Sequence, residues 1–231
     1  MIRGGPVGHR SVHEKEILTM ADYNAHTYFG MRVLERLPAA LRRQCAEDLT
    51  VFREGLYGPD PLIFLLRTKP VADHLHAAWR TESLPTLRAA MQRGPADERR
   101  FAAGYLLHQL LDEAVHGYIH AEDHGAAHLR VELALDKLIL DEVGRTRHPH
   151  LVTRDGLRTA QAGVRILAPA KPTDYVRGLR RMALLADYFR ADGPRFTAHL
   201  RKVDYAHART VRAVLEEQIV PAALTVERLL G

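Results

Sequence analysis

Apolar residues recur at helical spacing along most of this chain. Around the segment from Tyr23 to Arg36 the recurring apolar positions are Tyr28, Met31, Val33, Leu34 and Leu37, and Pro38 ends the run. Similar patterns predict further helices over residues 39–55, 70–92, 95–122, 126–143, 155–167, 171–192 and 194–230, the last with a kink at Pro221. No stretch alternates with a period of two between hairpin turns, and no segment repeats. The sequence therefore predicts an all-α protein, a multi-helix bundle with a site between its helices.

The predicted helices form one domain over residues 20–231, preceded by an unstructured leader at residues 1–19. Residues 22–140 would carry the chemistry described below, and residues 155–231 would supply C-terminal helices. Between these two parts, residues 144–154 read GRTRHPHLVTR, which predicts a loop.

Composition narrows the class of protein. Of the 231 residues, 46% are hydrophobic and 26% are charged, as in ordinary soluble globular proteins. The single cysteine, Cys45, excludes an internal disulfide and a cysteine-based zinc finger. No apolar run approaches the roughly 18 residues of a membrane span, and residues 1–19 lack the apolar core of a secretory signal. These features predict a cytoplasmic protein with no transmembrane segment.

Charge and histidine content point to possible ligands. Lysine and arginine number 33 against 28 aspartate and glutamate, a net charge of +5, which favours anionic partners such as phosphate esters, nucleic acid or lipid headgroups. There are also 14 histidines. Imidazole and carboxylate groups are the nitrogen and oxygen ligands that zinc uses in proteins.

Seven of these groups stand at intervals of four. They are His108, Asp112, His116, His120, His124, His128 and Glu132. Residues four apart lie on one face of an α-helix, but each step drifts by about 40° around the axis, so one helix cannot aim the whole row at one metal. The step Asp123-His124-Gly125 predicts a turn. We therefore expect two helices that present two half-sites to each other.

Each candidate ligand also has an interpretation without metal. His108, Asp112 and His116 could form a polar helix face, but their neighbours are apolar, and a buried aspartate is costly without a partner. His128 and Glu132 could form a solvated pair four residues apart. Metal ligation is the favoured interpretation for all five.

The remaining polar candidates lie outside this set. Asp60 could be a simple turn residue, but the segment GLYGPDP at 55–61 predicts a stiff turn in which two prolines would hold its carboxylate in place. His26 could be a core histidine. For His120 and His124 a surface or supporting role is favoured, and Asp136 is expected to orient a ligand histidine.

Four segments together resemble a known family. They are AHTYFGMRVLERLP at 25–38, GLYGPDP at 55–61, YLLHQLLDEAVHGYI at 105–119 and HLRVELALD at 128–136. This combination resembles the zinc-dependent phospholipase C family, which is related to the single-strand-specific zinc nucleases. The resemblance covers residues 25–136.

The resemblance implies a set of zinc ligands. Asp60, His108 and Asp112 would bind one zinc together with a histidine from residues 74–76. The second set would be His116, His128 and Glu132. His26 would serve a further ion that shares Asp112, which makes two or three zinc ions in total.

Two features of the chain bear on this ligand set. His74 and His76 diverge by about 200° on a helix, so only one can face the site, and we favour His76. Secreted members of the family use their processed first residue as a ligand, whereas His26 lies well inside this chain and no signal peptide precedes it.

The expected function is a zinc-dependent hydrolase of phosphate esters, a phospholipase C-like phosphodiesterase that uses a zinc-activated water. Asp60 would be the catalytic residue, because it could bind metal and also orient or deprotonate the attacking water. The substrate would be an anionic phosphate ester, with a phospholipid headgroup as one candidate. A single-strand nuclease is the alternative, ranked lower because only 6% of residues are aromatic. A metal-stabilised bundle that binds phospholipid or a partner without catalysis is the third hypothesis.

Overall fold

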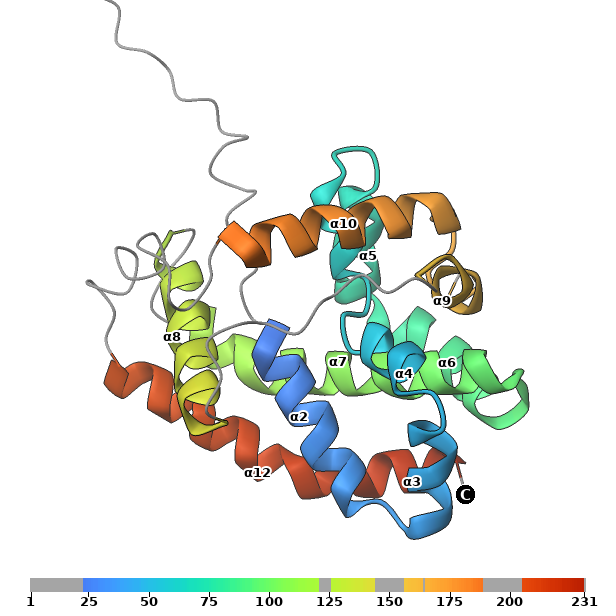
Figure 1. Ribbon diagram of the computed structural model, residues 1–231, viewed down its shortest axis with the longest axis horizontal. Coiled ribbons are helices and arrows are strands. Elements are labelled where there is room, and N and C mark those ends of the chain that lie inside the picture. Colours follow the sequence, from blue (N-terminus) through green and yellow to red (C-terminus); the bar gives the residue numbers. More distant parts are fainter. Residues whose placement is uncertain (1–22, 121–125, 144–155, 164, 189–204, 231) are drawn as a thin grey trace, which may run out of the picture.

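The computed structural model describes residues 23–120, 126–143, 156–163, 165–188 and 205–230, and every regular element within them is a helix (Figure 1). The elements are α2 (Tyr23–Arg36), α3 (Ala39–Ala46), α4 (Leu49–Gly55), η1 (Asp60–Phe64), α5 (Lys69–Ala77), η2 (Trp79–Ser83), α6 (Leu84–Arg93), α7 (Ala96–His120), α8 (Ala126–Glu142), α9 (Gly156–Gly163), α10 (Pro172–Tyr188) and α12 (Tyr205–Leu230). The predicted all-α fold is confirmed for these residues.

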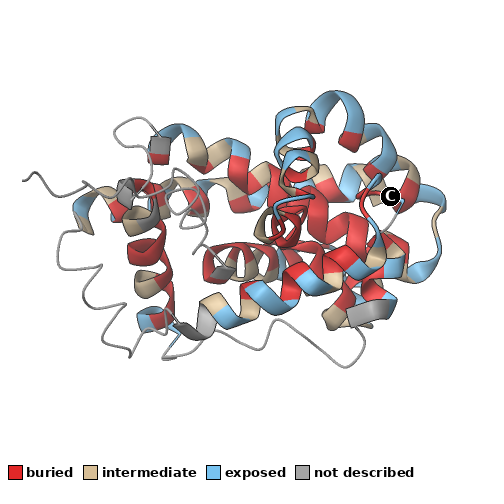
Figure 2. Cartoon of the chain, turned by 90° about the horizontal axis from the view of Figure 1, so that it is seen from above, coloured by how far each residue is buried: buried red, intermediate tan, exposed pale blue. Residues whose placement is uncertain are grey.

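Helix α7 is the centre of the molecule. It contacts α2, α3, α4, α6, α8, α9 and α12, and Figure 1 shows it running between α10 on one side and α12 on the other. Its residues from Phe101 to Gln109 are all buried, as expected of a helix with neighbours on every side. Figure 2 shows the same distribution, with buried residues along the inner helices and exposed ones at the outer edges. The polar residues of this stretch, His108 and Gln109 among them, are therefore held inside the core.

Two glycines bring α4 against α7 at backbone distance. A Cβ atom on Gly55 would lie 2.3 Å from the carbonyl oxygen of Phe101, and one on Gly104 would lie 2.2 Å from the carbonyl oxygen of Phe52. Only glycine allows backbones to approach this closely. A turn leads from the end of α4 to Asp60. The close approach of the two helices places this turn directly beside the middle of α7.

Two predicted helices are each divided in the structure. Residues 39–55 form α3 and α4, because Asp48 interrupts the helix and its side chain accepts hydrogen bonds from the backbone N–H groups of Thr50 and Val51. Residues 70–92 form α5, a π-helical turn η2 and α6. Pro85 stands at the start of α6, where its missing N–H is tolerated. In the middle of one continuous helix the same proline would break the hydrogen-bond pattern, so the helix is divided before it. The prediction of single helices was wrong in both places.

The helix predicted over residues 155–167 is shorter, since α9 ends at Gly163 and residues 165–170 form turns. The remaining predicted boundaries agree with the structure or fall outside the described residues. Helix α2 has the predicted bounds, α7 ends at His120 and α8 begins at Ala126. The leader at 1–19, the turn at 123–125 and the loop at 144–154 lie outside the described residues, as does the first part of the helix expected from residue 194. Pro221 lies within α12. Among the described helices, none combines the length and the apolarity needed to cross a bilayer.

Candidate metal centre

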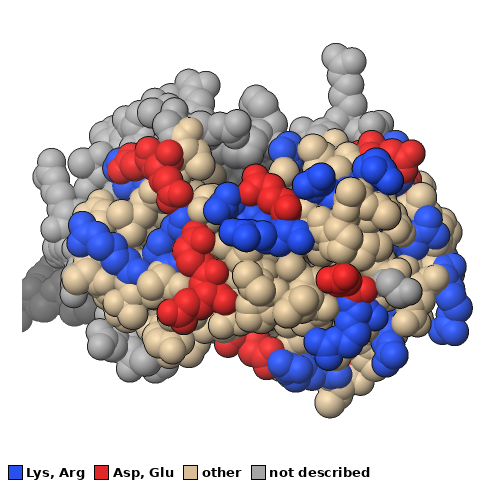
Figure 3. Space-filling model, turned by 90° about the horizontal axis from the view of Figure 1, so that it is seen from below, with Lys and Arg blue, Asp and Glu red and all other residues tan. Residues whose placement is uncertain are grey.

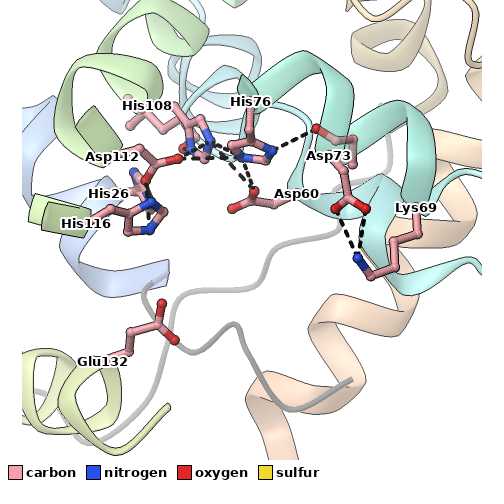
Figure 4. A network of polar contacts seen from close by, with 12 residues as sticks. His26, Asp60, Lys69, Asp73, His76, His108, Asp112, His116 and Glu132 are labelled. Carbon is pink, nitrogen blue, oxygen red and sulfur yellow. Dashed lines mark hydrogen bonds and ion pairs between the residues drawn. The ribbon is translucent and has the colours of Figure 1, made fainter. Parts of the chain in front are cut away.

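Four side chains from three elements converge beside the middle of α7 (Figure 4). Asp60 comes from the start of η1, His76 from α5, and His108 and Asp112 from α7. His76 Nε2 lies 3.1 Å from Asp60 Oδ1, 3.2 Å from His108 Nε2 and 3.5 Å from Asp112 Oδ2. His108 Nε2 lies 3.0 Å from Asp112 Oδ2 and 3.6 Å from Asp60 Oδ1. We call these four residues the first cluster.

Backbone carbonyls orient both imidazoles of the first cluster. His76 Nδ1 lies 2.8 Å from the carbonyl oxygen of Ala72, and His108 Nδ1 lies 3.2 Å from that of Leu56. A carbonyl oxygen only accepts, so each Nδ1 carries a hydrogen and donates it. In the neutral ring Nε2 is then the unprotonated nitrogen, and both Nε2 atoms point into the cluster. This is the arrangement found around metal-bound histidines.

Gly58 makes room for the ring of His108. Its backbone φ is +48°, a left-handed conformation that suits glycine, and a Cβ there would lie 2.5 Å from His108 Cδ2. From α10, the hydroxyl of Tyr175 lies 3.1 Å from the carbonyl oxygens of both Glu54 and Gly58. The turn that carries Asp60 is therefore fixed by α7 on one side and by α10 on the other.

Asp112 has histidines on both of its oxygens. While Oδ2 faces His76 and His108, Oδ1 lies 3.3 Å from His26 Nε2 and 3.8 Å from His116 Nε2. Burial alone would raise the pKa of the Asp112 carboxyl, but His108, His116 and His26 outweigh it and hold this pKa well below its usual value. Asp112 is thus an anionic carboxylate that can serve two sides of one site.

A second cluster joins α7 to α8. It consists of His116, His128 and Glu132, which offer ligand atoms within 4.8 Å of one another. His128 Nε2 lies 2.7 Å from Glu132 Oε1, and the rings of His116 and His128 are 5.8 Å apart at their centres. His128 and Glu132 are buried, whereas the side chain of His116 is 39% exposed. The second cluster therefore lies nearer the surface on its His116 side.

The carboxylates change the protonation of the histidines around them. Burial disfavours the charged form of His76, but Asp60 and Asp112 outweigh this effect and raise its pKa to about 9. Burial opposes the same change at His108, where Asp112 and Asp60 again raise the pKa. At His128, Glu132 raises the pKa against the effect of burial. A proton or a metal cation could supply the positive charge that these carboxylates attract.

The sequence-predicted ligands are brought together in the structure. The eight residues predicted as ligands are His26, Asp60, His76, His108, Asp112, His116, His128 and Glu132, and all lie in or beside the two clusters. His74 points away, with 58% of its side chain exposed and its Nε2 2.8 Å from Glu82. The side chain of His120 and the whole of His124 lie outside the described residues.

Asp136 does not have the role expected from the sequence. It was predicted to orient a ligand histidine, but it accepts hydrogen bonds from the backbone N–H groups of Asn24 and Ala25, at 3.1 and 3.2 Å, and from the Asn24 side chain at 2.9 Å. Its carboxyl group therefore caps the N-terminus of α2 from α8. Asp136 acts on His26 only indirectly, by fixing the helix end on which His26 stands.

Several supporting residues escaped the sequence analysis. Nothing in the sequence indicated that Ala72 and Leu56 would orient the two histidines, or that Tyr175 would hold the turn before Asp60. Gly58 was detectable in principle, because a glycine directly before a proline and a candidate ligand often marks an unusual backbone conformation.

Three groups within the described residues could hold a metal ion. They are His26 with Asp60 and His108, His76 with His108 and Asp112, and His116 with His128 and Glu132. Comparison with known proteins adds no identity, since no family model, no curated protein and no solved structure matches the chain. The chemistry of these side chains is therefore the basis for inferring a function.

Proposed function

We propose that this protein is a zinc-dependent hydrolase of phosphate esters with phospholipase C-like phosphodiesterase chemistry. The observation that carries the proposal is the spacing of the first cluster. Five distances among its four ligand atoms lie between 3.0 and 3.6 Å. Four ligands about 2.0 to 2.1 Å from a tetrahedral zinc lie about 3.3 Å apart. Two imidazoles and two carboxylates suit zinc in ligand type, and the ligand atoms of His76, His108 and Asp112 have the spacing of ligands to one ion.

The second cluster has a different character. It offers three ligands, His116, His128 and Glu132, and three protein ligands with one open position are typical of a catalytic zinc. Asp112 Oδ1 lies near its His116 side, so this carboxylate could be shared by ions in both clusters. His26, on the same oxygen, would help to hold a third ion. The ligand set therefore supports two or three zinc ions.

The chain's own residues suit attack on a phosphodiester. Bound zinc would supply a water of lowered pKa and would neutralise the charge of the phosphate oxygens. Asp60 has one oxygen directed at His76, and its second oxygen points away from that ring (Figure 4). That second oxygen is available to orient a water or to accept its proton. We assign Asp60 this role in addition to ligation.

The substrate class follows from charge. The site would concentrate positive charge on bound ions, which favours an anionic phosphate ester, and a phospholipid headgroup is one candidate. A single-strand nuclease would need exposed aromatic side chains to stack bases. Among the large hydrophobic residues that the structure describes as exposed, the only aromatic one is Tyr118. This ranks the nuclease below the phospholipase C-like activity.

A metal and activity assay tests the proposal. Purified protein should contain at least two equivalents of zinc and hydrolyse bis(4-nitrophenyl) phosphate, and a chelator should abolish the hydrolysis. Asp60→Asn should lower the rate at least about a hundredfold, whereas Asp73→Asn should not. Asp73 is a matched control, because it is an exposed aspartate on α5 that pairs with Lys69. Zinc below one equivalent together with full activity of Asp60→Asn would refute the hydrolase.

Two further outcomes separate the alternatives. Hydrolysis of phosphatidylcholine vesicles in preference to single-stranded oligonucleotides supports the phospholipase C-like activity, and the reverse preference supports the nuclease. Full zinc content without hydrolysis of any of these substrates would indicate the metal-stabilised binding protein.

A further inference from the structure

A second candidate binding site lies between α6 and α12. It is a pocket of about 510 Å³, and none of its lining residues belongs to either metal cluster. Four of the lining residues are arginines, namely Arg80, Arg88, Arg93 and Arg228, and none is acidic. Figure 3 views the face on which α12 lies and shows basic side chains predominating toward the side where Figure 1 places α6 and the end of α12. The pocket is thus a concave basic surface.

Three of the four arginines have no ionic partner among the described residues. Arg80 is the exception, since its Nε lies 2.6 Å from Glu113 Oε1 and its guanidinium lies 4.7 Å from the centre of the Trp79 ring. Arg88, Arg93 and Arg228 form no ion pair within the part of the chain that the structure describes. Like charges gathered in one concavity repel each other, and an anion bound between them relieves that repulsion.

Helical spacing explains why these groups converge. Pro85, Arg88, Ala89 and Gln92 stand at i, i+3, i+4 and i+7 on α6 and therefore share one face. Thr225, Arg228 and Leu229 share a face of α12 in the same way. The two faces oppose each other across the pocket, so Arg88 and Arg228 reach it from opposite walls. A phosphate group is suited to such an arrangement, because guanidinium groups donate paired hydrogen bonds to its oxygens.

The pocket is also apolar in part. Leu84, Pro85, Ala89 and Leu229 line it beside the arginines. Its volume falls within the range of about 300 to 1,000 Å³ that is usual for small-molecule sites. An inorganic anion would leave these apolar groups uncovered, whereas a phosphate attached to an apolar or aromatic body would cover them.

We propose that this pocket binds a small organic phosphate, with the phosphate between Arg88 and Arg228 and the apolar body against Leu84 and Leu229. The site is independent of the metal clusters, so it stands or fails separately from the proposed hydrolase. A soluble phosphate monoester and a phosphomonoester lipid headgroup share this chemistry, and the experiment distinguishes them.

Binding of 1-naphthyl phosphate to the full-length protein, followed by naphthyl fluorescence, tests the proposal. Inorganic phosphate should bind more weakly than the naphthyl ester. The double variant Arg88→Gln/Arg228→Gln should weaken binding of the ester at least about tenfold. The matched control is Arg42→Gln/Arg209→Gln, which removes the same charge from exposed arginines on α3 and α12 outside the pocket and should change binding less than about twofold.

The possible outcomes decide the matter. Equal weakening of binding by both double variants would mean that only net charge matters. Equal affinity for inorganic phosphate and the naphthyl ester would mean that the apolar wall contributes nothing. Either result overturns the proposal, as does the absence of binding. Vesicles of phosphatidylcholine containing phosphatidic acid provide the lipid arm. If they bind with the same dependence on Arg88 and Arg228 and compete with the ester, the natural ligand is a lipid headgroup, and if they do not, it is a soluble phosphate.

Discussion

His76 and His108 meet at their Nε2 atoms, 3.2 Å apart, because each ring donates its Nδ1 hydrogen to a backbone carbonyl. Two neutral imidazoles would place two lone pairs against each other at this distance. The contact is stable only with a cation between the rings, either a proton on one of them or a metal ion bound to both. The carboxylates of Asp60 and Asp112 attract that same cation.

Replacing His76 tests the ligand set directly. His76→Gln should lose about one equivalent of bound zinc per chain to a weak chelator, because removal of one of its four ligands weakens the first cluster's hold on the ion. His74→Gln should keep the full zinc content, since His74 lies outside the cluster and pairs with Glu82. Metal analysis after dialysis against a weak chelator measures both. Equal losses in the two variants would show that the first cluster is not the site of binding.

Replacing Gly58 tests the role of the turn. Gly58→Ala introduces a Cβ against the ring of His108 at a residue with positive φ, so we expect a loss of about 2 kcal/mol or more in the free energy of unfolding. Gly117→Ala is the control, because Gly117 lies inside α7 and a Cβ there meets nothing within 4 Å. That variant should gain about 0.5 to 1 kcal/mol. Urea denaturation of both proteins gives the comparison.

The pH dependence of stability should change sign with metal content. Without metal, the folded-state pKa of His76, about 9, lies above its value of about 6.5 in the unfolded chain. The stability from its protonated form is therefore complete below about pH 6.5 and is lost as the pH rises through 9. Zinc must displace that proton, so its apparent affinity should rise about tenfold per pH unit up to about pH 9.

Denaturation of chelator-treated and zinc-loaded protein across pH 6 to about 9.5 measures both trends. His76→Gln should flatten the curve of the metal-free protein. A metal-free protein whose stability increases with pH over this range would contradict the protonation assigned to His76.

Asp136 gives a second prediction about the pH dependence of stability. Burial raises the pKa of its carboxyl well above the usual value, even though Asn24 and Ala25 donate hydrogen bonds to it. The neutral acid is therefore favoured on folding, and stability falls as the pH rises above about 3.9 toward the folded-state pKa. Asp136→Asn keeps an acceptor and removes the charge, so its stability relative to the natural protein should increase with pH. Asp136→Ala leaves the end of α2 uncapped and should cost about 1 to 3 kcal/mol.

Sequence periodicity was sufficient where one helix face repeats without interruption. The bounds of α2 follow from its apolar positions and Pro38, and the spacing of His108, Asp112 and His116 on α7 follows from helical geometry. The break between α3 and α4 does not follow from it. That break depends on the Asp48 side chain competing for backbone N–H groups, a local interaction that apolar spacing does not reveal.

Contacts between residues far apart in the sequence were the second feature that the sequence did not predict. Asp136 and Asn24 are 112 residues apart, and only the docking of α8 against α2 brings them together. In the same way, the choice of His76 over His74 depends on how α5 is turned toward η1. The arginines of the pocket between α6 and α12 appear in the sequence as separate surface charges. Such contacts depend on how the helices pack against one another, so they cannot be predicted from the spacing of residues in a single sequence.

The two oxygens of Asp112 have a consequence for the order in which ions would load. A cation in the first cluster would withdraw negative charge from Oδ2, and the same carboxylate would then attract a cation near Oδ1 less strongly. That first cation would also lock the carboxylate plane in the orientation that the other side needs. An ion bound in one cluster would therefore change the metal affinity of the other. Stepwise titration of the protein with metal should yield unequal affinities even if the two ligand sets were chemically identical.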